Sequence, residues 1–126
     1  MNYTIVGDNF NRILERIELF VGIHANHKIC LYHQWSDLDS LNPIGKSSIL
    51  LDSSNVEIDV AEYYHDISYY VHDSCIYIVL RNDCKKYELT ISKGDGVYND
   101  IGRIIIRHWH CGMKEYVYYI IDGMLD

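Results

Sequence analysis

Residues 10–22 read FNRILERIELFVG, and apolar side chains recur in this segment every three or four positions. Polar and charged residues fill the positions between them, which is typical of a helix with one apolar face. Asp8 offers a carboxylate for the helix start, and Gly22 suits a helix end. The sequence therefore predicts an amphipathic helix over about residues 9–22, whose apolar stripe packs on a sheet. The stripe consists of Phe10, Ile13, Leu14, Ile17, Phe20 and Val21.

Short β-prone segments separated by turns make up most of the remaining chain. We expect strands where apolar and aromatic residues alternate or cluster between Gly, Asn, Asp and Ser. Turns are predicted at residues 81–83, 92–96 and 111–113, and a loop is predicted over 36–48. The predicted strands lie around Tyr3 and Ile5 and at residues 28–35, 56–60, 75–80, 87–91, 104–109 and 116–121.

Residues 61–73 fit two different structures. Five apolar or aromatic residues recur there at helical spacing, and Asp59 with Glu62 could form a capping box. Against a helix, Tyr is a good strand former, and Ile67, Tyr69 and Val71 alternate with polar or exposed positions. We favour a strand. The residues at helical spacing are Tyr63, Tyr64, Ile67, Tyr70 and Val71.

The order of these elements predicts the fold class. One helix near the N-terminus and short, evenly spaced strands are typical of an α+β protein. We expect an N-terminal amphipathic helix packed on a mostly antiparallel β-sheet, a meander of about five to seven strands. A chain of 126 residues without a linker or repeat is expected to form a single domain over residues 1–126.

Composition excludes several classes of partner. The formal net charge is −7, and binding to nucleic acid or to an anionic membrane would need clustered Lys and Arg. The N-terminal residues show no secretory signal. Four cysteines without a C-x2-C pair are then expected to be reduced and to pack as small core residues. They are Cys30, Cys75, Cys84 and Cys111. These features together predict a cytoplasmic protein.

The negative charge is concentrated in residues 36–73, here called the acidic segment. It holds eight acidic residues against one basic residue, Lys46, so its net charge of −7 equals that of the whole chain. The acids are Asp37, Asp39, Asp52, Glu57, Asp59, Glu62, Asp66 and Asp73. One interpretation is that these carboxylates only keep the protein soluble and unaggregated.

The other interpretation is a binding face for a basic protein. Clustered carboxylates steer a cationic partner, and tyrosines give rigid contact area at interfaces. Such an array also resembles the phosphates that a nuclease recognises. Of the tyrosines at 63, 64, 69 and 70, we expect one or two to touch the partner and others to be core. The candidate partner-binding residues are Asp37, Asp39, Glu57, Asp59, Glu62, Asp66, Tyr63, Tyr64 and Tyr69.

The histidines are the remaining candidates for chemistry. His108 and His110 flank Trp109, so in a strand both would lie on one face. Such a pair could bind zinc together with a thiol, or act as general acid and base, but it lacks the usual close ligand pairs of zinc sites. We expect an exposed pair on the solvent side of a strand whose other side carries Ile104 and Ile106. The sequence predicts no catalytic residue, metal or cofactor.

In size, charge distribution and lack of a catalytic motif, the chain resembles the small acidic cytosolic immunity proteins of bacterial toxin–immunity systems, including contact-dependent growth inhibition. That resemblance implies a non-enzymatic antitoxin that binds and neutralises a basic toxin domain such as a nuclease. The resemblance is one of profile, so it assigns no functional residue. Two alternatives are a phage-type nucleic-acid mimic that inhibits a defence protein, and a small His-dependent enzyme or ligand-binding domain. A deep pocket lined by His108 or His110 would favour the last of these.

Overall fold

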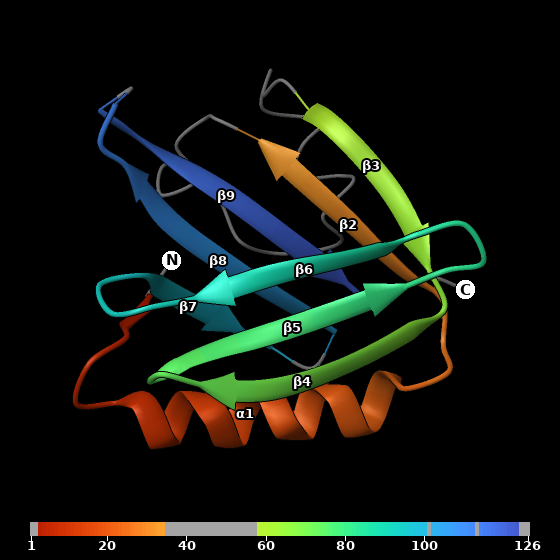
Figure 1. Cartoon of the computed structure of the whole chain (residues 1–126), viewed down its shortest axis with the longest axis horizontal. Helices are drawn as coiled ribbons and strands as arrows, with labels where there is room; N and C mark the ends of the chain where they lie inside the picture. The colour runs from red at the N-terminus through yellow and green to blue at the C-terminus, as the bar shows by residue number, and fades with distance from the viewer. Residues whose placement is uncertain (1–2, 35–57, 101, 113, 124–126) are drawn as a thin grey trace.

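The computed structural model describes residues 3–34, 58–100, 102–112 and 114–123 (Figure 1). Within these residues it contains one helix and nine strands. They follow in the order β1 (Thr4–Ile5), α1 (Phe10–His24), β2 (Ile29–Gln34), β3 (Ile58–Tyr64), β4 (Asp66–His72), β5 (Cys75–Arg81), β6 (Lys86–Ile91), β7 (Gly96–Asn99), β8 (Arg103–His110) and β9 (Glu115–Asp122). The predicted loop at 36–48 lies outside the described residues.

The strands form two antiparallel sheets. One has six strands in the order β1-β7-β8-β9-β2-β3, and the other has three in the order β4-β5-β6. In Figure 1 the three-stranded sheet crosses one face of the six-stranded sheet, and α1 runs beside β4. Buried side chains from both sheets and from α1 belong to one apolar cluster. The core therefore lies between the sheets, and the helix closes one side of it.

The predicted helix is confirmed, with different ends. Ile13, Ile17 and Phe20 of its stripe are at most 2% exposed. The helix begins at Phe10 after Asn9 rather than Asp8, and no side chain caps it. It also continues past Gly22, because the ring of His24 packs against Phe20 with centroids 4.3 Å apart. A left-handed backbone conformation, with a φ of 66°, follows the helix at Asn26.

The α+β class is confirmed, and its strands are arranged differently from one meander. Residues 61–73 are the end of β3 and all of β4, so the strand that we favoured there is present. The chain then changes sheet after Tyr64 and again after Ile91. β7 was not predicted, because its four residues, GVYN, directly follow a strong turn signal. β7 pairs with β8 and β1, and this pairing makes it a strand although its short sequence has no local strand pattern.

The cysteines correct one expectation. All four are free thiols, and Cys30 is buried as expected. Cys84 and Cys111 are exposed, so they are not core residues. Both lie in turns, at the ends of β5 and β8, where the strand alternation that buries apolar residues has stopped. Among the described residues, no helix is long and apolar enough to cross a membrane.

Candidate functional site

The structure describes part of the predicted binding face. Asp37, Asp39 and Glu57 lie outside the described residues. Asp59 and Glu62 belong to β3, whose backbone is described at these positions while their side chains are not. The remaining candidates are Tyr63, Tyr64, Asp66 and Tyr69, which lie at the end of β3 and in β4.

Tyr63 and Tyr64 point to opposite faces of β3, as neighbours in a strand do. Tyr63 is 53% exposed, and the ammonium of Lys28 lies 4.5 Å from the centre of its ring. Tyr64 is 1% exposed and belongs to the core cluster. Tyr64 therefore offers no surface to a partner in this structure, whereas Tyr63 does.

The same alternation separates the candidates in β4. Tyr69 packs against the core cluster and is half-buried. Asp66 lies 3.9 Å from Nη1 of Arg81 across the β4–β5 pair. Nη1 of Arg81 also donates a hydrogen bond to the hydroxyl of Ser68, at 3.3 Å. Asp66 and Ser68 thus share the outward face of the three-stranded sheet, and Tyr69 faces the interior.

A stacked pair of tyrosines occupies the same outward face. Tyr70 lies opposite Tyr77 across β4 and β5, with ring centroids 4.7 Å apart and planes only 8° from parallel. The hydroxyl of Tyr70 donates to Oε1 of Glu88 on β6, at 3.0 Å. Partial loss of hydration raises the pKa of both phenols, and the Glu88 carboxylate raises that of Tyr70 further. We call Tyr70, Tyr77 and Glu88 the tyrosine patch.

Sequence reasoning did not select Tyr77 or Glu88. These residues lie 7 and 18 positions from Tyr70, and only the strand register brings the three together. The signal available in the sequence was alternation: Tyr77 and Glu88 each sit one residue from a core position, Ile78 and Leu89. Alternation predicts an outward side chain, but it does not predict which outward side chain is the neighbour.

Charge on this face is nearly balanced. Asp66 and Glu88 are matched by Arg81 and Lys86, which pair across β5 and β6. Asp73, which is 85% exposed at its side chain, contacts His72 at 3.1 Å. The acidic excess of the chain therefore does not lie on the outward face of the three-stranded sheet. It resides in residues 37–62 of the acidic segment, where six acids stand against Lys46.

The histidine prediction is wrong about the face. Positions 104, 106 and 108 are two residues apart, so their side chains share one face of β8. Ile104 and Ile106 are core residues, and His108 follows them where the interior opens to solvent, with 48% of its side chain exposed. Its Nδ1 lies 2.8 Å from Oδ1 of Asp95.

Asp95 is held by the turn that connects the two sheets. The amide of Asp95 donates to the carbonyl of Ser92, and Gly94 between them has a φ of 93°, as the third position of a type II turn requires. The second carboxylate oxygen, Oδ2, accepts from the Ser92 amide at 2.9 Å and from the Ser92 hydroxyl at 3.3 Å. Asp95 is only 4% exposed. The sequence showed it only as a turn residue.

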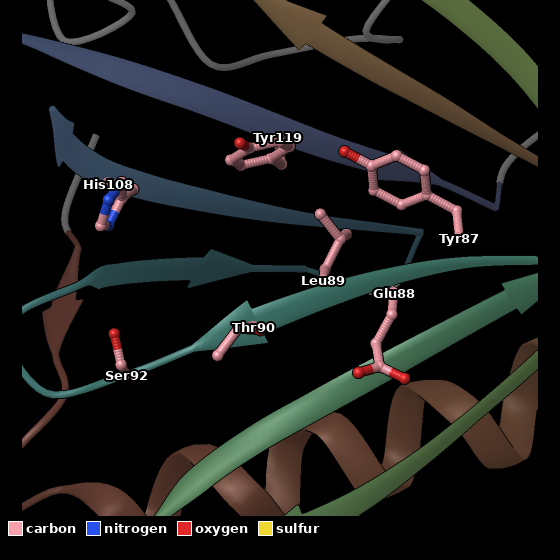
Figure 2. A pocket seen from close by; sticks show the side chains of 7 residues that line it. All are labelled: Tyr87, Glu88, Leu89, Thr90, Ser92, His108 and Tyr119. Carbon is pink, nitrogen blue, oxygen red and sulfur yellow. The ribbon is translucent and has the colours of Figure 1, made fainter.

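A pocket of about 260 Å³ lies beside this pair (Figure 2). β6, an edge strand of the three-stranded sheet, forms one side of it, and β8 and β9 form the other. Figure 2 shows His108 at one end, with the rings of Tyr119 and Tyr87 along one wall. Burial raises the pKa of Tyr119, and nearby Tyr87 and Asp95 raise it further. The lining residues are Tyr87, Glu88, Leu89, Thr90, Ser92, His108 and Tyr119.

Metal ligation has no support in the described part of the chain. There, no three His, Cys, Asp or Glu side chains gather in a way that could hold an ion. The hydroxyl of Ser92 donates to Asp95 and not to His108, so these three residues are not ordered as a nucleophile, base and orienting acid.

Comparison with known proteins gave no matching family model, no matching curated protein and no matching solved structure.

Proposed function

We propose that this protein is a cytoplasmic, non-enzymatic inhibitor of the immunity type, which binds and neutralises a basic toxin domain such as a nuclease. The observation that carries the proposal is the tyrosine patch on the outward face of the three-stranded sheet, whose Tyr70 belongs to the acidic segment. Tyr70 is 44% exposed in this patch. Large exposed aromatic groups fixed in place are typical of the energetic centres of protein interfaces.

The geometry of the patch suits an arginine of a basic partner. Tyr70 and Tyr77 are already stacked, and the hydrogen bond from Tyr70 orients the Glu88 carboxylate. An incoming guanidinium can lie on an aromatic face while it donates to a carboxylate beside it. Because the rings and the carboxylate are ordered before binding, little conformational entropy is lost when the contact forms.

The acids of residues 37–62 have a different role in this proposal. Exposed carboxylates attract a cationic partner over about one Debye length, roughly 8–10 Å at physiological salt. They speed the encounter, while the tyrosine patch holds the complex. The two groups should therefore affect different rate constants: the acids the association rate, and the tyrosine patch the dissociation rate.

The experiment begins by capturing the partner. A photoreactive benzoyl-phenylalanine placed at position 68, two residues from Tyr70 on the same face of β4, should cross-link one basic protein in cells of the source organism, and that protein is then purified. Tyr70→Ala should raise the Kd for it by about 30-fold, as expected for an interface centre. Leu19→Ala, at a 65% exposed position on α1, is the matched control and should change the Kd by less than about twofold. Equal effects of the two variants would contradict the proposal.

A further inference from the structure

We propose that the pocket beside Asp95 and His108 binds a small uncharged ring compound, which donates an O–H or N–H hydrogen bond to Nε2 of His108. This site does not depend on the proposed inhibitor function, and a pocket lined by His108 is the feature that favours the alternative of a ligand-binding domain. The site needs no partner protein, and the tyrosine patch contributes only Glu88 to its lining.

The contact with Asp95 sets the tautomer of His108, that is, which of its ring nitrogens carries the proton. Oδ2 of Asp95 accepts two hydrogen bonds from Ser92, and Oδ1 lies 2.8 Å from Nδ1 of His108. A carboxylate offers only acceptors to its neighbours. Nδ1 of His108 must then carry the proton. In the neutral imidazole the lone pair lies on Nε2, and this nitrogen becomes a hydrogen-bond acceptor.

The same contact bears on where the acceptor, Nε2 of His108, lies relative to the pocket. Nδ1 faces Asp95, which is buried, whereas about half of the His108 side chain is exposed and lines the pocket. Figure 2 shows the ring at the pocket's end, next to Ser92 and across from Tyr119. The imidazole therefore has exposed surface that borders the pocket, and Nε2 is the ring nitrogen that does not contact the carboxylate.

The walls define the ligand's shape and polarity. The rings of Tyr87 and Tyr119 give flat aromatic surface, and the 4% exposed Leu89 adds little to it. Much of the remaining lining is polar and comes from Glu88, Thr90, Ser92 and His108. A phenol is already protonated and neutral at ordinary pH, and burial raises the pKa of Tyr119 further above its usual value. A volume near 260 Å³ is below the roughly 300–1,000 Å³ of sites for drug-sized molecules, so the occupant is about the size of a single ring.

Charge excludes anions from this site. Among the described residues that line the pocket there is no Lys or Arg, whereas Glu88 belongs to the lining and the Asp95 carboxylate contacts His108. A carboxylate or phosphate would meet two negative charges without a compensating cation. An uncharged ring with one hydrogen-bond donor meets an acceptor at the end of the pocket and the rings of Tyr87 and Tyr119 along one wall.

Phenol, toluene and benzoate form the test series, since they share a ring and differ in the group that would reach His108. The isotope-labelled full chain is titrated with each near pH 8, and the signals of His108, Leu89 and Tyr119 are followed by NMR. Phenol should shift these signals saturably. Toluene and benzoate should bind at least about tenfold more weakly, because toluene lacks the donor and benzoate carries the wrong charge.

Two variants test the role of the tautomer. Asp95→Asn presents an amide N–H to Nδ1, which moves the ring proton to Nε2 and removes the acceptor, so phenol should bind at least about tenfold more weakly. His110→Ala, two residues away and outside the lining, should leave phenol binding unchanged.

Three results would overturn the inference even without the variants. Toluene binding as tightly as phenol would make the pocket an apolar trap, and tighter binding of benzoate would make it an anion site. Absence of any saturable shift in the folded protein would mean that no such site exists.

Discussion

Asp95 and His108 join the two sheets of this protein. Asp95 lies in the turn between β6 of the three-stranded sheet and β7 of the six-stranded sheet, and its carboxylate is 2.8 Å from the imidazole of His108 on β8. The carboxylate is 5% exposed and also accepts the Ser92 amide. The connection between the sheets is thus fixed by side-chain hydrogen bonds at a point where strand pairing is interrupted.

Removing this carboxylate should destabilise the fold. Asp95→Ala leaves the Ser92 amide and the His108 ring without their acceptor, at a cost of about 1–3 kcal/mol in the free energy of unfolding measured with urea. Asp83→Ala is the matched control, because Asp83 also pairs with a histidine, His65, at 3.1 Å but is exposed. The control should cost less than about 0.5 kcal/mol. Similar costs for both variants would mean that burial of Asp95 contributes nothing.

The helix stripe provides a test of the core. Ile17 is fully buried, so Ile17→Ala should lower the free energy of unfolding by about 2–5 kcal/mol in chemical denaturation. Leu19→Ala, on the exposed side of the same helix, should cost less than about 1 kcal/mol. A cost below about 0.5 kcal/mol for Ile17→Ala would show that the stripe does not face the core.

The raised pKa of the Tyr119 phenol predicts that the folded protein loses stability in alkali. Burial raises the pKa of Tyr119 in the folded state above the value near 10 of the unfolded chain. Above about pH 10 the unfolded chain releases this proton first, so the contribution of Tyr119 is complete below that pH and is lost as the pH rises through the folded pKa. The free energy of unfolding of the natural protein, measured with urea from pH 9 to 11.5, should fall relative to that of Tyr119→Phe as the pH rises. A difference that stays constant with pH would contradict this.

The cysteines should differ in reactivity. Cys84 and Cys111 are exposed, so a thiol reagent should label both in the folded protein. Cys30 is 0% exposed and should react only when the protein unfolds. Mass spectrometry of the labelled peptides, with and without urea, checks both statements. Labelling of Cys30 as fast as that of Cys84 under native conditions would place Cys30 outside the core.

Local patterns predicted the elements of this fold better than their arrangement. Ile13, Ile17 and Phe20 recur at the spacing of one helix face, and alternation such as that of Tyr87, Leu89 and Ile91 is a property of one strand alone. The division into two sheets depends on pairing between distant segments. β2, for example, lies between β9 and β3, and no local pattern carries that information.

The same difference between local patterns and pairing of distant segments explains which site residues the sequence could identify. Alternation in sequence predicts that one of Tyr63 and Tyr64 is buried, without predicting which. The stack of Tyr70 on Tyr77 and the contact of Asp95 with His108 both require the register of paired strands or a turn between sheets. Residues that act together here are brought together by the fold, and their types alone did not identify them.

The central functional claim is that the acids of residues 37–62 speed association with the partner, while the tyrosine patch slows dissociation. The test measures association kinetics with the purified partner, which is identified by cross-linking, at low and physiological salt. It compares two triple variants, each of which removes three negative charges. One is Glu57→Gln, Asp59→Asn, Glu62→Gln in the acidic segment. The other is Asp8→Asn, Glu15→Gln, Glu18→Gln at exposed positions before and on α1.

The acidic-segment variant should associate about tenfold more slowly at low salt, and its rate should depend less on salt, because steering by those carboxylates is lost. The helix variant should keep most of the natural rate and salt dependence. If both variants slow association equally, the concentrated charge serves only solubility, and the proposed binding face is contradicted.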